Sequence, residues 1–103
     1  MPKHLQLKVY WNKNFLMLAV DKILFKQYVP LTTYYFWPKT EAWEQLKLEL
    51  ESKPGLKNEE KVSVLNSATE IINYWREARN IEDVRVVANK FKGINVLSSH
   101  ILQ

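Results

Sequence analysis

The spacing of apolar residues changes near residue 40 of this chain, and the change limits how the chain can fold. Near the start, apolar residues alternate with polar or amphipathic ones, which is the period of a strand with one buried face. The apolar members of this alternation are Leu5, Leu7, Val9 and Trp11. Beyond residue 40 the apolar residues recur every three or four positions, as in a helix packed on one side. Strands followed by helices indicate an α+β fold.

The first 40 residues predict a small antiparallel sheet. A strand over residues 5–11 is followed by a polar turn and by a continuously apolar strand over 15–20, so we expect a hairpin that closes at Lys13. Residues 31–37 are β-branched and aromatic and predict a third strand or an aromatic-rich loop. The segment 21–29 fits either a short helical turn or a continuing strand.

Two helices are predicted after the sheet. Thr40 is placed to cap a helix over residues 41–52, and Asn58 is placed to cap a second helix over about 59–79. Both helices carry glutamates in the first turn, where the positive end of the helix dipole favours them. Because the loop between them is short, we expect the two helices to pack as an antiparallel pair that covers the sheet.

The C-terminal part of the chain carries weaker patterns. Apolar residues alternate well enough over 84–88 to indicate a possible edge strand. Residues 93–103 show no such pattern, and we expect a tail that becomes ordered only against a partner. The prediction is therefore a single domain over residues 1–92, followed by this tail.

The composition argues against catalysis and against a bound metal. There is no cysteine, and two histidines, His4 and His100, are too few for a metal site. Gly55 and Gly93 are the only glycines, so neither a phosphate-binding loop nor a nucleophile elbow can form. No apolar run reaches the roughly 20 residues of a membrane helix. We expect no catalytic residue, metal, cofactor, small-molecule substrate or membrane contact.

Charge is segregated along the chain. Residues 1–40 contain six lysines and one acid, a net charge of +5, whereas residues 41–84 have a net charge of −4. A basic N-terminal third is suited to a polyanion such as RNA, while the acidic middle is expected to face solvent or a protein. The residues expected to contact RNA by their charge are Lys3, Lys8, Lys13, Lys22, Lys26, Lys39, Arg85, Lys90 and Lys92.

Aromatic residues are dense between Tyr34 and Trp37. In a strand, alternate members of this run point to opposite faces, so one pair can build the core while the other is presented outward. We expect Tyr34 or Tyr35 to stack on a nucleobase or to pack against a neighbouring protein.

Two segments resemble the plastid-specific ribosomal protein three family of plastids and cyanobacteria. The first, over residues 30–54, contains the aromatic run, the Trp-Pro pair and a helix with Trp43; the second, over 65–75, ends in Tyr-Trp. The strands over 7–21 also fit the family. The resemblance implies a non-catalytic component of the small (30S) ribosomal subunit that contacts 16S-type ribosomal RNA and neighbouring subunit proteins. The chain departs from the family pattern at Gly55 and from residue 80 onward.

Compartment and a rival function are also part of the prediction. Lysine outnumbers arginine 12 to 3, which suggests an AT-rich coding genome. No transit peptide precedes the first strand. Together these features favour a plastid-encoded protein that acts in the stroma over a cyanobacterial one.

The alternative function is a protein–protein adaptor. In that case the acidic helices and outward aromatics would bind a partner, and the lysines would only keep the protein soluble.

Overall fold

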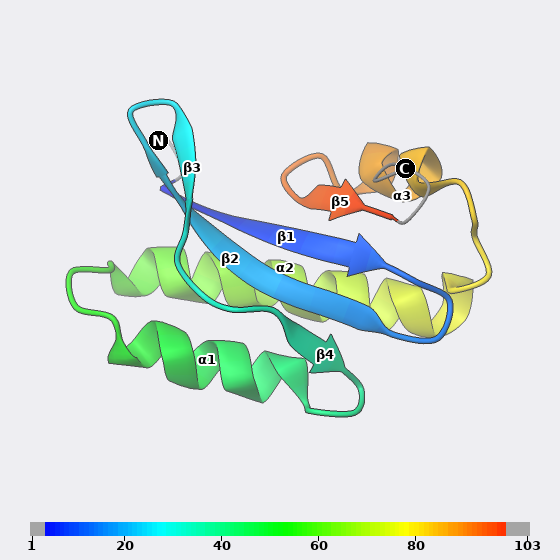
Figure 1. The fold of residues 1–103 in the computed structure, drawn as a ribbon, viewed down its shortest axis with the longest axis horizontal. Coiled ribbons are helices and arrows are strands. Elements are labelled where there is room, and N and C mark those ends of the chain that lie inside the picture. The colour runs from blue at the N-terminus through cyan, green and yellow to red at the C-terminus, as the bar shows by residue number, and fades with distance from the viewer. Residues whose placement is uncertain (1–3, 99–103) are drawn as a thin grey trace.

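Five strands form one curled sheet in the computed structural model, which describes residues 4–98 (Figure 1). The strands are β1 (Leu5–Trp11), β2 (Leu16–Leu24), β3 (Gln27–Pro30), β4 (Tyr35–Trp37) and β5 (Asn95–Leu97). Their order is β3-β2-β1-β5. β4 also pairs with β2, at residues 16–18, whereas β3 pairs with residues 21–24 of the same strand. The pairs among β1 to β4 are antiparallel, whereas β5 runs parallel to β1. The expected α+β class is confirmed, with a mixed rather than a purely antiparallel sheet.

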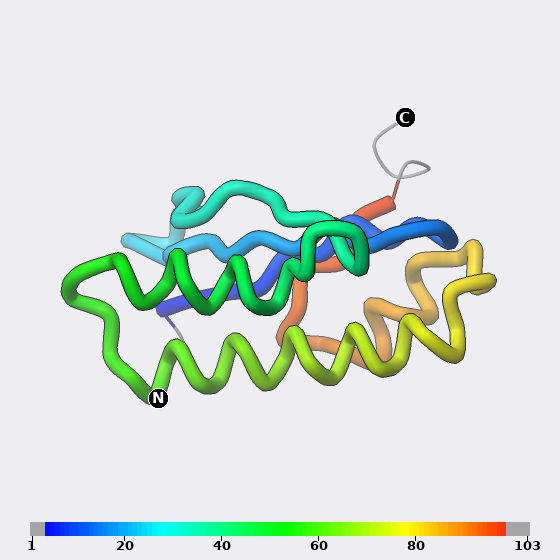
Figure 2. Tube along the Cα trace, turned by 90° about the horizontal axis from the view of Figure 1, so that it is seen from below, coloured from blue at the N-terminus to red at the C-terminus, as the bar shows by residue number. Residues whose placement is uncertain are grey.

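Three helices complete the fold: α1 (Ala42–Ser52), α2 (Asn58–Ala78) and α3 (Val84–Lys90). α1 and α2 run in opposite directions, as predicted, and pack on the sheet (Figures 1 and 2). The loop between them turns at Gly55, whose φ of 82° lies in the left-handed region that favours glycine. A glycine at this position therefore suits the turn between the two helices.

Strand alternation separates the two faces of the sheet. Leu7 and Val9 of β1 pair with Val20 and Leu18 of β2, and all four are buried with Ile71 of α2 in the hydrophobic core. The residues between them in β1 are only partly buried and point to the face that the helices leave uncovered. This uncovered face and the turns at its ends hold five of the candidate RNA-binding residues, namely Lys8, Lys13, Lys26, Tyr34 and Lys39.

The aromatic segment forms a shorter strand than predicted. The single strand expected over residues 31–37 is interrupted, because only Tyr35–Trp37 pairs with β2 as β4, while β3 forms earlier, at residues 27–30. Thr32 explains the interruption: its hydroxyl accepts a hydrogen bond from Val20 N–H at 3.0 Å, which replaces the ladder partner of that amide. The ambiguous segment 21–29 is resolved as a continuing strand and hairpin.

Neither of the predicted helix caps forms. The Thr40 hydroxyl donates to the Phe36 carbonyl oxygen at 2.5 Å and accepts from the Phe36 amide at 3.1 Å, so it closes the turn after β4 instead. Glu41, in a left-handed conformation, occupies the capping position of α1. Asn58 is the first residue of α2, after Lys57, and no side chain caps that helix.

The C-terminal prediction was wrong in two respects. Residues 84–88 lie in helix α3, because the Asp83 side chain accepts a hydrogen bond from the Arg85 amide and caps a helix that buries Val84 and Val87. Of the expected tail, residues 95–97 instead pair with β1 as β5, which buries Val96. Residues 99–103, and His100 with them, lie outside the described residues.

Candidate nucleic-acid interface

Two turns carry exposed lysines at the same end of the sheet. Lys13 lies in the β1–β2 turn and Lys39 in the turn between β4 and α1. The strand register places the two turns together, because Leu16 at the start of β2 pairs with Trp37 at the end of β4. Both lysines are exposed, so their ammonium groups face solvent where a polyanion can approach.

The C-terminal end of α2 reaches the same end of the sheet. The Trp75 indole N–H donates to the Asn12 carbonyl oxygen in the β1–β2 turn at 2.7 Å. The Arg76 guanidinium lies 5.4 Å from the centre of the Trp37 ring, and that of Arg79 lies 5.6 Å from the centre of the Trp75 ring. These distances are those of cation–π contacts, which hold the guanidinium groups over indole rings.

Four cations from three separate segments therefore meet at one end of the molecule. We call this group, Lys13, Lys39, Arg76 and Arg79, the basic end. Sequence reasoning missed the two arginines because it averaged charge over residues 41–84, where acids dominate. The signal that could have found them was their position three residues apart in the last turns of the predicted helix, next to Trp75.

The cations of the basic end take part in none of the ion pairs found within residues 4–98. Those pairs are His4–Glu60, Lys8–Asp21, Lys53–Glu49 and Arg85–Asp83. Lys22 and Lys26 are likewise absent from them. Because an ion pair within the chain reduces the charge that a partner senses, these cations offer more charge to phosphates than the paired ones do.

Lys8 is held inside the protein's own structure. Its ammonium nitrogen lies 2.7 Å from Asp21 Oδ1, and the two side chains are 15% and 8% exposed. The same nitrogen lies 5.1 Å from the centre of the Tyr34 ring on the uncovered face of the sheet. Of the two candidate tyrosines, Tyr34 is therefore the one on the uncovered face.

Tyr35 points the other way, toward α1. Its hydroxyl donates to Glu49 Oε1 at 2.7 Å, and its ring packs against the core. This hydrogen bond, then burial and the charge of the carboxylate, raise the pKa of Tyr35 above its ordinary value. The structure places the ring where it joins β4 to α1.

The remaining candidates lie apart from the basic end. The Arg85 side chain donates two hydrogen bonds of 3.0 Å to Asp83, which hold the pKa of Asp83 below its ordinary value. Lys90 lies 5.1 Å from the centre of the Tyr74 ring in a shallow hollow that also contains two glutamates. Lys92 is exposed just before β5, and Lys3 lies outside the described residues.

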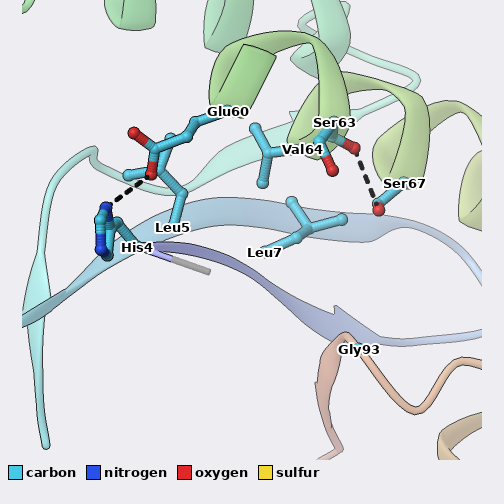
Figure 3. Close-up of a pocket in the computed structure, with 8 residues that line it drawn as sticks. All are labelled: His4, Leu5, Leu7, Glu60, Ser63, Val64, Ser67 and Gly93. Atoms are coloured by element: carbon cyan, nitrogen blue, oxygen red, sulfur yellow. Dashed lines mark hydrogen bonds and ion pairs between the residues drawn. The ribbon is translucent and has the colours of Figure 1, made fainter. Parts of the chain in front are cut away.

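A small pocket near the start of β1 is too small for a substrate. His4 Nδ1 lies 3.4 Å from Glu60 Oε2 at its edge (Figure 3). Its volume is about 50 Å³, enough for a few water molecules at most.

Within residues 4–98, no group of three or more metal-ligating side chains could hold an ion. None of the helices in this part of the chain has the length and apolar character needed to cross a membrane.

Comparison with known proteins identifies the family. Residues 31–78 match the family model described as plastid and cyanobacterial ribosomal protein (PSRP-3 / Ycf65). A small ribosomal subunit protein cS23 from Cyanidium caldarium is 43% identical over 98 residues, which cover 95% of this chain and 89% of the relative. The chain belongs to this family.

Two further members of the family show similar levels of identity. The cS23 protein of Gracilaria tenuistipitata var. liui is 42% identical, over 90% of this chain and 94% of the relative. The probable cS23 protein of Synechococcus sp. (strain JA-3-3Ab) is 53% identical, over 74% of this chain and 76% of the relative. Membership of the PSRP-3/Ycf65 family confirms the family resemblance seen in the sequence. It also confirms the expectation of a ribosomal protein of plastids or cyanobacteria. The chain is a structural ribosomal protein and not an enzyme.

Proposed function

We propose that this PSRP-3/Ycf65 protein is a structural constituent of the small ribosomal subunit and binds 16S-type ribosomal RNA mainly through the basic end. The observation that carries the proposal is the meeting of four cations from three separate segments, none of them in an ion pair found within residues 4–98. The names of the relatives, all small-subunit proteins, support the choice of subunit.

The chemistry of the basic end suits phosphates rather than base edges. Lys13 and Lys39 are exposed point charges on turns, which can contact phosphates without reading sequence. Arg76 and Arg79 add planar guanidinium groups, which donate pairs of hydrogen bonds to phosphate oxygens. Because both arginines rest on indole rings, their orientation is partly fixed before binding, which lowers the entropy lost on association.

This interface differs in part from the one expected from charge alone. The sequence pointed to the whole basic N-terminal region, including Lys8. Because Lys8 is mostly buried and paired with Asp21, we assign it to the fold and move the centre of the interface to the turns. Lys22 and Lys26, at the other end of β2, remain part of the proposed contact.

Sucrose-gradient sedimentation of a tagged copy tests the proposal. We expect the protein to sediment with small ribosomal subunits, and the variant with Lys13→Ala and Lys39→Ala to move to the top of the gradient at a salt concentration that the wild type tolerates. The matched control removes Lys47 and Lys57, on α1 and in the following loop, and is expected to sediment like the wild type.

Two results would contradict the proposed function. A wild-type protein that stays at the top of the gradient would exclude subunit membership. A protein that remains bound to partner proteins after ribonuclease digestion, with no loss in the Lys13/Lys39 variant, would favour the adaptor.

A further inference from the structure

Exposed apolar side chains are concentrated on one hairpin. Among the described residues, eight large hydrophobic side chains are exposed, and four of them lie at residues 24–29, which we call the hairpin tip. These four are Leu24, Phe25, Tyr28 and Val29. Phe25 is 97% exposed, so both faces of its ring are open to solvent. Packing within the chain does not account for this ring.

The backbone of the hairpin tip is strained. Phe25 and Lys26 have φ angles of 49° and 66°, so both lie in the left-handed region. A two-residue hairpin turn of this kind normally contains Asn-Gly or another pair with glycine, because other side chains crowd the backbone there. Phenylalanine and lysine thus make the turn less stable than the usual residues would, and the ring gains no contact in return. This combination points to a contact outside the chain.

The hairpin tip is also cationic. Lys26 is next to Phe25, Lys22 lies shortly before it, and no aspartate or glutamate occurs between Lys22 and Thr40. The preceding acid, Asp21, is buried beside Lys8. A ligand that reaches Phe25 must therefore accept an aromatic ring and an ammonium group together. An unpaired nucleotide does so, because its base stacks on the ring and its phosphate pairs with the lysine.

We propose that the hairpin tip binds an unpaired nucleotide of RNA, with the Phe25 ring stacked on the base and the Lys26 ammonium group on a neighbouring phosphate. The hairpin projects from the body of the molecule (Figure 1), so the ring can enter a loop or bulge without a clash from the helices. β2 connects this tip with the β1–β2 turn at the basic end. This inference rests on the proposed function, and it adds a second contact point at the opposite end of β2.

Substitutions at Phe25 separate stacking from simple burial. Association of each variant with salt-washed small ribosomal subunits, from which the protein has been removed, is measured at several salt concentrations. Phe25→Ala and Phe25→Leu both lose the ring, Phe25→Tyr keeps it, and Leu48→Ala is the control at an exposed apolar residue on α1. Phe25→Gly also removes the ring but relieves the backbone strain, so its fold is expected to be at least as heat-stable as the wild type.

We expect Phe25→Ala, Phe25→Leu and Phe25→Gly to weaken association about 10-fold or more, the range for loss of one base–aromatic stack. Phe25→Tyr and Leu48→Ala are expected to bind like the wild type. The salt dependence of Phe25→Ala should equal that of the wild type, because phosphate contacts are retained. Ultraviolet irradiation of the wild-type complex should attach a nucleotide to the tryptic peptide of residues 23–26.

Three results overturn the inference. Unchanged binding of Phe25→Ala and Phe25→Gly would show that the ring makes no contact. Full binding of Phe25→Leu without a nucleotide adduct would show an apolar contact with a neighbouring protein instead. An adduct confined to other peptides would place the base elsewhere. In each case the proposed function is still supported if the wild-type protein binds small subunits with a marked salt dependence. A wild-type protein that does not bind the subunits would contradict both the proposed function and the inference about the hairpin tip.

Discussion

The Lys8 ammonium nitrogen lies 2.7 Å from Asp21 Oδ1 on the face of the sheet that the helices leave uncovered. Both side chains are mostly buried, and the Tyr34 ring lies beside the ammonium group. Within residues 4–98, no donor is aligned to form a hydrogen bond with this carboxylate oxygen, so the charge of Lys8 is its main compensation. A lysine in the most basic part of the sequence thus stabilises the fold.

Replacing Lys8 alone is expected to destabilise the protein. Lys8→Ala leaves the Asp21 carboxylate buried without a counter-charge, at a cost of about 3 kcal/mol in the free energy of unfolding. The double variant with Lys8→Met and Asp21→Asn removes both charges and should recover much of that loss. Chemical denaturation measures both. A Lys8→Ala variant as stable as the wild type would show that the pair contributes nothing.

The indole of Trp75 joins α2 to the β1–β2 turn, and its loss should cost more than that of Trp43. Trp75 is 4% exposed and donates to the Asn12 carbonyl oxygen, whereas Trp43 is only partly buried and donates to the Leu65 carbonyl oxygen within the helical layer. We expect Trp75→Ala to lower the free energy of unfolding by about 3–5 kcal/mol and Trp43→Ala to lower it less. Equal losses in thermal melts would contradict this ranking.

Relieving the strained turn should stabilise the free protein. Lys26→Gly removes the side chain at a φ of 66° and is expected to raise the free energy of unfolding by about 1 kcal/mol. The neighbouring control, Gln27→Gly, lies in β3 with no positive φ and should lower it. A Lys26→Gly variant that melts below the wild type would argue against the left-handed turn.

The Tyr35–Glu49 hydrogen bond predicts a stability change at alkaline pH. The pKa of Tyr35 is raised in the fold, so the neutral phenol is favoured there. Its contribution to stability is therefore complete below the ordinary tyrosine pKa of 10.0 and is lost as the pH rises through the folded value. The difference in free energy of unfolding between wild type and Tyr35→Phe should therefore stay constant well below pH 10.0 and shrink as the pH rises above it. A constant difference would contradict the raised pKa.

Local patterns predicted much of the fold. The alternation in β1 and the helical spacing in α2 gave the right elements, because each buries one face against the same core. The strand predicted from Val84 was wrong because Val84, Val86 and Ala88 alternate as in a strand, whereas the residues that are buried, Val84 and Val87, are spaced as in a helix, which Asp83 caps. β5 is three residues long and depends on the edge of β1, which no local pattern reveals.

The candidate interface was harder to predict than the fold. Charge along the sequence made Lys13 and Lys39 candidates, but it could not show that Lys8 would form an ion pair with Asp21 on the neighbouring strand. It also hid Arg76 and Arg79 among acids that lie near them in sequence. Only the packing of α2 against the β1–β2 turn brings these arginines to the lysines. Interfaces built from several segments depend on such long-range contacts.

Salt dependence of binding tests the central claim most directly. The association constant of the protein with small ribosomal subunits is measured over a range of salt concentrations for the wild type, for Lys13→Ala with Lys39→Ala, and for the control with Lys47→Ala and Lys57→Ala. If the basic end contacts phosphates, the slope of log association constant against log salt concentration should fall by about 2 for the first variant and remain that of the wild type for the control. An unchanged slope for the first variant, or an equal fall for the control, would show that RNA binds elsewhere.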